Sequence, residues 1–181
     1  MWSVRTPAPV RVPHLCRWLL LAGWPVHLVF AALVAGTTAL GMAMGQSAIV
    51  SSAVTVAVHY AAGVWASFVV HELGHLVALS RSRGVTALTL ERGIWRLSIS
   101  PHGDLRPAET LTAAVAGPGI CVIVGAALWV GAADLHLHGW YIAHAVFLLP
   151  AFGDGRAAVT ASRGILRHRG HLSAGDEDHT P

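Results

Sequence analysis

Four long apolar stretches, separated by short polar segments, dominate the sequence. A spanning α-helix needs about 20 mainly apolar residues, so each stretch is long enough to cross a membrane. The pattern therefore predicts an all-α polytopic membrane protein with about four transmembrane helices. The stretches cover residues 18–40, 52–80, 110–133 and 140–162.

Both ends of the chain are polar. Residues 1–17 contain Pro and Arg and are expected to form a flexible cytoplasmic tail, and residues 166–181 are expected to be a disordered polar tail. Arginines precede the stretch 18–40, as in a signal peptide. Its length, however, exceeds the usual apolar core of about 7–15 residues, and no A-x-A site follows promptly. We therefore expect it to be a retained first transmembrane helix.

The segment between the second and third stretches has a different character. Within residues 84–100, the runs GVTALTLE and IWRLSIS are rich in β-branched and large apolar residues, with Glu91-Arg92-Gly93 between them. Such runs on either side of a turn predict a small β-hairpin at the cytoplasmic membrane surface. An irregular interfacial loop is the alternative.

Composition and charge agree with a membrane protein. The chain of 181 residues is 54% hydrophobic and only 12% charged, and all its basic side chains are Arg. These lie before the first stretch, between the second and third, and at or beyond the end of the fourth, while loops 41–51 and 134–139 contain none. The positive-inside rule then places both termini and the hairpin in the cytoplasm. Topology explains the formal charge of +3, so nucleic-acid binding is not expected.

An HExxH motif lies in the later half of the second stretch, within VVHELGHLV at residues 69–77. At helical spacing His71 and His75 lie one turn apart on one face and can bind the same metal ion, and Glu72 beside them can polarise water. An ionisable group at membrane depth costs about 2.5–3.5 kcal/mol. Three such groups together therefore indicate a function.

A catalytic zinc site normally has three protein ligands, so a third is needed at the depth of the histidines. At 1.5 Å per residue, His71 and His75 lie roughly 15 and 9 Å before the cytoplasmic end of the second stretch. Asp154 lies roughly 13 Å before the corresponding end of the fourth. Its depth matches, which makes Asp154 the best candidate; pairing with Arg156 is the alternative.

Other histidines and the two cysteines are weaker candidates. His144 lies ten residues before Asp154, which places it roughly 15 Å nearer the outer face of a continuous helix. We expect His144, His27 and His59 to be packed or hydrogen-bonded helix residues. The cysteines, Cys16 and Cys121, give no sign of a disulfide framework and are expected to be free thiols.

The chain carries HELGH at 71–75, then PAE at 107–109 with AGP at 116–118, and then LLPAFGDGR at 148–156. In this order the three stretches resemble the site-2-protease-type intramembrane zinc metallopeptidases. HELGH at 71–75 resembles the zinc-binding helix of that family. Pro107-Ala108-Glu109 with Ala116-Gly117-Pro118 resembles its P-x-E…AGP stretch. LLPAFGDGR at 148–156 resembles its LLP…LDGGR stretch. The likeness covers residues 52–165, which we take as a three-helix metalloprotease core.

The resemblance implies that His71, His75 and Asp154 bind Zn²⁺ and that Glu72 is the general base. It implies a protease of the plasma membrane, whose substrate is a transmembrane protein cut within or near its spanning helix in the lipid bilayer. The hairpin would offer an edge strand to the unwound substrate. The sequence does not indicate an oligomeric state.

Two positions depart from the family pattern, because Phe147 and Cys121 stand where many members have Asn. They leave open a non-proteolytic metal-binding membrane protein that acts by binding or regulation. A metal transporter is a third possibility. It is disfavoured because the sequence lacks a series of ligands from one membrane face to the other.

Overall fold

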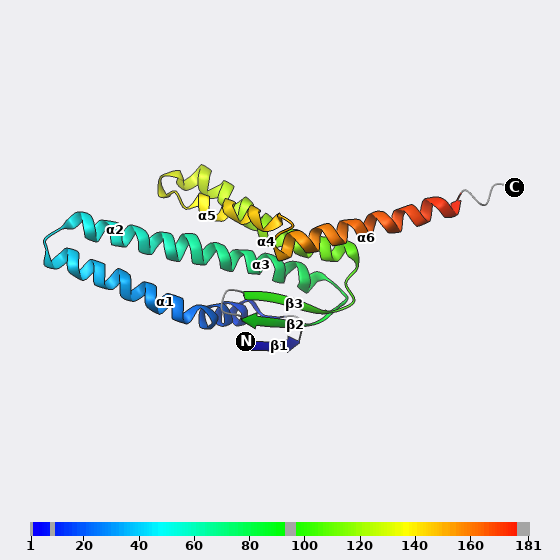
Figure 1. The fold of residues 1–181 in the computed structure, drawn as a ribbon, viewed down its shortest axis with the longest axis horizontal. Helices are drawn as coiled ribbons and strands as arrows, with labels where there is room; N and C mark the ends of the chain where they lie inside the picture. Colours follow the sequence, from blue (N-terminus) through cyan, green and yellow to red (C-terminus); the bar gives the residue numbers. More distant parts are fainter. Residues whose placement is uncertain (1, 8–9, 93–96, 177–181) are drawn as a thin grey trace.

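The computed structural model describes residues 2–7, 10–92 and 97–176, and most of these are helical (Figure 1). The first long helix, α1 (Val12–Ala43), is followed by α2 (Ser47–Val58), which runs through a π-helical segment, η1 (His59–Trp65), into α3 (Ala66–Arg81). Two strands, β2 (Val85–Arg92) and β3 (Leu97–Gly103), lead to the helix α4 (Pro107–Ala132). Short helices η2 (Ala133–Leu135), α5 (His138–Ile142) and η3 (Ala143–Leu148) precede α6 (Gly153–Asp176).

Three helices in the described part of the chain are long and apolar enough to cross a membrane: Val12–Ala43, Ser47–Arg81 and Pro107–Leu135. They correspond to the first three apolar stretches. Large apolar side chains on α1 point away from the rest of the protein, with Leu28, Val29 and Leu33 each more than 60% exposed. An exposed apolar surface of this kind suits contact with lipid, so these helices suggest a membrane location.

The fourth apolar stretch does not form the continuous helix expected from the sequence. It is divided into α5, η3 and the start of α6. Leu149 is extended, as the residue before a proline prefers, and Pro150 cannot donate the backbone hydrogen bond that would continue a helix. A turn closed by Phe152 N–H and the Leu149 carbonyl then leads into α6. Of the four predicted spanning helices, three are therefore present as helices long and apolar enough to cross a membrane, and the fourth is not continuous.

The predicted β-hairpin is confirmed, and the structure adds a third strand to it. β2 pairs with β3 in antiparallel register, with Leu90 opposite Ile99; residues 93–96, between the strands, lie outside the described part. β1 (Trp2–Pro7) pairs with the other edge of β2. The alternative of an irregular loop is thus wrong. Residues 2–7 are also not the flexible tail that was expected, because β2 supplies hydrogen-bond partners for their backbone.

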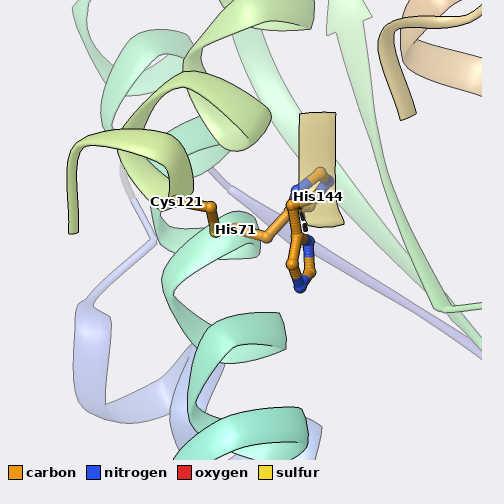
Figure 2. Close-up of side chains that lie close together, drawn as sticks. All are labelled: His71, Cys121 and His144. Carbon is orange, nitrogen blue, oxygen red and sulfur yellow. Dashed lines mark hydrogen bonds between the residues drawn. The ribbon is translucent and has the colours of Figure 1, made fainter. Parts of the chain in front are cut away.

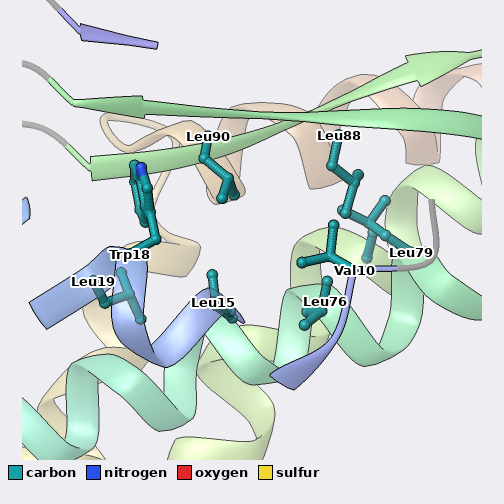
Figure 3. Packing of buried hydrophobic residues seen from close by; sticks show 9 residues of the cluster. Val10, Leu15, Trp18, Leu19, Leu76, Leu79, Leu88 and Leu90 are labelled. Carbon is teal, nitrogen blue, oxygen red and sulfur yellow. The ribbon is translucent and has the colours of Figure 1, made fainter. Parts of the chain in front are cut away.

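The sheet packs on the helix that carries the HExxH motif. Leu88 and Leu90 point from one face of β2 toward α1 and α3, where they meet Leu15, Leu76 and Leu79 (Figure 3). All five side chains are at most 3% exposed. Because β1 belongs to the same sheet, the N-terminal segment and the hairpin lie at the same end of the helices. This agrees with the common cytoplasmic side that the arginines predict for them.

Helix α6 extends further than expected, to Asp176. Residues 166–176 were predicted to belong to a disordered tail, and the structure assigns them to this helix. Leu166 and Arg167 are good helix formers, and no proline follows before Pro181. The remainder of the predicted tail, residues 177–181, lies outside the described part.

Candidate metal centre

Two helices bring His71, His75 and Asp154 together. The histidines lie one turn apart on α3, and their Nε2 atoms are 3.0 Å from each other. Asp154 is in the first turn of α6, and its Oδ2 lies 3.2 Å from His71 Nε2 and 3.4 Å from His75 Nε2. These are the three side chains that the sequence analysis predicts as metal ligands.

The spacing of these atoms fits a single metal ion. Zinc takes nitrogen and oxygen ligands at about 2.0–2.2 Å in a tetrahedron, which separates any two ligand atoms by about 3.3–3.6 Å. Of the observed separations, 3.4 Å lies within this range, and 3.2 and 3.0 Å lie below it by a few tenths of an ångström at most. Two imidazole nitrogens and a carboxylate oxygen are also donors that zinc commonly binds. The group could therefore hold a metal ion.

The ring of His75 is oriented by α4. Its Nδ1 lies 2.7 Å from the backbone carbonyl of Ala113. A carbonyl can only accept, so Nδ1 carries the proton and Nε2 keeps the lone pair that a metal needs. Ligand histidines in metalloproteins are usually held in this way.

Two glycines allow α4 to approach α3 closely enough for this contact. A Cβ added at Gly74 would come within 2.5 Å of the Ala116 carbonyl oxygen. A Cβ at Gly117 would come within 2.5 Å of His75 Nε2. Small residues at helix contacts in membrane proteins permit such close backbone packing. The AGP stretch at 116–118 thus shapes the space around His75.

We expect Gly117→Ala to weaken metal binding, measured with zinc, by about tenfold or more, since disturbing the groups that orient a ligand histidine typically costs about 10–100-fold in metal affinity. The added methyl group would overlap the His75 ring and displace it from its present position. The matched control is Gly119→Ala, where a Cβ would meet only Val115 of the same helix, at 4.0 Å. Zinc affinity is measured by competition with a coloured chelator. Equal affinity in the two variants would contradict the role assigned to Gly117.

The turn before α6 fixes Asp154. A Cβ at Gly155 would overlap the Leu149 carbonyl oxygen, so the chain can make this turn only with glycine there. Asp154 then lies in the first turn of α6, where the helix dipole favours a carboxylate. In the described residues, Asp154 forms ion pairs with His71 and His75 and none with Arg156. The alternative pairing with Arg156 is therefore wrong.

Glu72 and the three converging side chains line one cavity of about 640 Å³. Glu72 is 5% exposed and directly follows His71 on α3. Another wall of the cavity comes from β3, through Ile99, Ser100 and Pro101. The cavity thus contains a buried carboxylate beside the candidate ligands and is bordered by an edge strand.

A second buried group shares His71 with the first. His71, Cys121 and His144 come from α3, α4 and η3, and Figure 2 shows their side chains together. Their ligand atoms lie within 4.8 Å of one another, so this group could also hold a metal ion. The Cys121 thiol donates a hydrogen bond to the Ser67 carbonyl at 3.2 Å. Cys121 and Cys16 are both free, as expected.

The depth predicted for His144 is wrong, because its Nδ1 lies 3.1 Å from Nδ1 of His71. The chain turns at residues 149–152, so His144 and Asp154 do not lie on one continuous helix. The distance along the membrane normal therefore cannot be calculated from the ten residues between them. Pro150 was the available signal for that turn. The expectation of hydrogen bonding is correct for all three histidines: His144 contacts Ser67 and His71, His27 contacts Tyr60, and His59 contacts Trp140.

Phe147, one of the two departures from the family pattern, packs beside this centre. Its ring centroid lies 5.2 Å from that of His71 and 5.3 Å from that of His144. It also lines the cavity. An apolar ring therefore covers the two imidazoles on this side.

Comparisons of the chain with models of protein families, with curated proteins and with solved structures find no match.

Proposed function

We propose that this chain is an intramembrane zinc metalloprotease that hydrolyses peptide bonds within or near the spanning segments of membrane proteins. The observation that carries the proposal is the convergence of His71, His75 and Asp154 in one cavity with Glu72. The histidines and Glu72 belong to Ser47–Arg81, which is long and apolar enough to span a membrane. Ionisable groups in such a segment are costly and usually functional.

Zinc held by these three ligands would supply a Lewis acid that acidifies water and polarises a peptide carbonyl. Glu72 would accept the proton from the attacking water and then donate it to the leaving amine nitrogen. The burial of Glu72 keeps bulk water from competing with this transfer. The Ala113 carbonyl keeps His75 in the tautomer that leaves Nε2 free for the metal.

The edge strand that borders the cavity favours an extended polypeptide as substrate. β3 is an edge strand, because the sheet order is β1-β2-β3, and its residues Ile99–Pro101 line the cavity. An extended peptide can add to such an edge through main-chain hydrogen bonds. A helical substrate cannot, because its amides are already paired within the helix. The spanning helix of a substrate would therefore have to unwind before it is cut.

This requirement gives a prediction about substrates. Replacing Gly and Pro around the cut site of a cleaved spanning segment with Leu or Ala should slow cleavage, since each Gly or Pro disfavours the helix by about 1–3 kcal/mol relative to Ala. The measurement is the initial cleavage rate of matched substrates in lipid vesicles. The same replacements two turns away from the cut site serve as the control. Cleavage that is unaffected by stiffening at the cut site would contradict strand addition.

The location follows from the same reasoning. The exposed apolar surface of α1 suits the lipid bilayer. The distribution of arginines favours the cytoplasmic side of the plasma membrane for the sheet and both termini. Residues of β3 line the cavity, so the cleavage site would lie toward the cytoplasm.

One observation favours a second candidate, a non-proteolytic membrane protein that binds metal. The Phe147 ring covers His71 and His144 where many proteases of the resembled family have Asn. A polar side chain that could hold the substrate is thus replaced by an apolar one. Glu72→Gln distinguishes the two candidates, because only proteolysis requires a proton acceptor at this position.

The test is a comparison of membrane-protein fragments in cells that express the wild type or Glu72→Gln. Fragments with new ends inside a spanning segment, present only with the wild type, are the expected result and would also identify a substrate. Both proteins must be present in the membrane in equal amounts and with equal zinc. Identical fragment patterns across several growth conditions would favour the non-proteolytic candidate.

A further inference from the structure

A chain of buried polar groups lies behind His71, on the side away from the candidate zinc site. The Ser67 hydroxyl donates to the Val64 carbonyl at 3.0 Å, and Ser67 Oγ lies 3.0 Å from His144 Nε2. The other ring nitrogen of His144, Nδ1, lies 3.1 Å from His71 Nδ1 (Figure 2). Ser67, His71 and His144 are 1%, 5% and 8% exposed, so water does not replace these contacts.

The directions of these hydrogen bonds follow from the number of protons available. Ser67 has one hydroxyl proton, which it gives to Val64, so its oxygen must accept from His144 Nε2–H. A neutral imidazole carries one N–H, so His144 Nδ1 is then an acceptor. His71 must therefore donate its Nδ1–H to His144, and its own Nε2 keeps a lone pair. That Nε2 is the atom facing His75 and Asp154.

We infer that His144 is a positioning residue, held by Ser67, that fixes the ring of His71 and presents its Nε2 to the metal. The inference rests on the proposed function, since it assumes zinc at His71, His75 and Asp154. Each ligand histidine then has one partner for its second nitrogen. For His75 this partner is the Ala113 carbonyl, and for His71 it is His144. Such partners commonly contribute about 10–100-fold to metal affinity.

The same contacts argue against His144 as a metal ligand. Both of its ring nitrogens are already engaged, one by Ser67 and one by His71. The Cys121 thiol is engaged as well, by the Ser67 carbonyl. His71 cannot offer Nδ1 to a second ion while that atom donates a proton to His144. The His71, Cys121 and His144 group therefore serves as a support for the zinc site.

The first experiment compares zinc affinities of the full-length protein in lipid nanodiscs, measured by chelator competition. His144→Phe keeps the ring but removes the acceptor, and should weaken zinc binding by about 10–100-fold. His144→Asn places an oxygen near the position of Nδ1 and should recover most of this loss. His59→Phe is the matched control, because His59 is hydrogen-bonded to Trp140 and does not line the metal cavity. It should bind zinc as the wild type does.

The outcomes separate this inference from the proposed function. Wild-type affinity in His144→Phe would overturn the inference and leave the zinc site intact. An equal loss in His144→Phe and His144→Asn would also overturn it, since an acceptor alone would then not suffice. A wild-type protein that binds no zinc would overturn the proposed function and, with it, this inference.

A second measurement does not depend on how the variants fold. Nitrogen NMR spectra of ¹⁵N-histidine-labelled wild-type protein, loaded with ¹¹³Cd as a substitute for zinc, report which nitrogens bind the metal. We expect coupling of cadmium to Nε2 of His71 and His75, with His144 neutral, protonated at Nε2 and uncoupled. Coupling of cadmium to His144 would overturn the inference and make His144 a ligand.

Discussion

Replacing Asp154 with Ala is expected to lower bound zinc from about one ion per chain to nearly none and to abolish proteolysis. Two neutral imidazoles would remain, whereas a catalytic zinc site normally uses three protein ligands. The negative charge that balances the ion would also be lost. The measurement is the zinc content of purified protein after dialysis against a weak chelator, together with the cleavage of a substrate found by the fragment comparison.

Arg156→Gln provides the matched control for this variant. Arg156 lines the same cavity, two residues from Asp154, but forms no ion pair with it in the described residues. Zinc content in Arg156→Gln should therefore equal that of the wild type. If Asp154→Ala retained its zinc, Asp154 would not be a ligand, and the proposed centre would have to be abandoned.

The second large effect is expected for Glu72→Gln, which should keep its zinc and lose peptide hydrolysis. The amide has nearly the shape of the carboxylate but cannot accept a proton from water. Removing a general base usually costs about 10²–10⁴-fold in rate. The measurement is the cleavage rate of the identified substrate in vesicles, at matched zinc content.

Glu109→Gln is a suitable control, because Glu109 caps the start of α4 by accepting from the Arg106 backbone N–H and does not line the cavity. The cleavage rate of Glu109→Gln should stay close to that of the wild type, because weakening this cap affects only the stability of α4, and only slightly. Hydrolysis that persists in Glu72→Gln at the wild-type rate would remove Glu72 from the mechanism.

Much of the secondary structure could be predicted from the sequence, because each helix or strand depends mainly on the pattern of residues within it. Apolar runs predicted four spanning helices, of which three are present as helices long and apolar enough to cross a membrane. The β-branched runs on either side of Gly93 predicted the hairpin. The HExxH spacing placed two histidines on one face of α3. Asp154 was selected by its depth, counted from the end of the fourth apolar stretch near Arg163. The turn before α6 lies on the other side of Asp154 and does not affect that distance.

The remaining features depend on contacts between distant segments. β1 forms because β2 offers it an edge, and nothing within residues 2–7 indicates that partner. His144 was misplaced because its depth was counted through a helix that the chain does not form at Leu149 and Pro150. The bond between Ser67 and His144 joins residues 77 positions apart, so only the three-dimensional structure reveals it.

The measurement that bears most directly on the proposed centre is zinc-edge X-ray absorption of the purified wild-type protein. Zinc bound by His71, His75 and Asp154 should show only nitrogen and oxygen neighbours, at about 2.0–2.2 Å, with two imidazole rings. A zinc–sulfur distance of about 2.3 Å would contradict this centre. It would place the metal in the His71, Cys121 and His144 group instead.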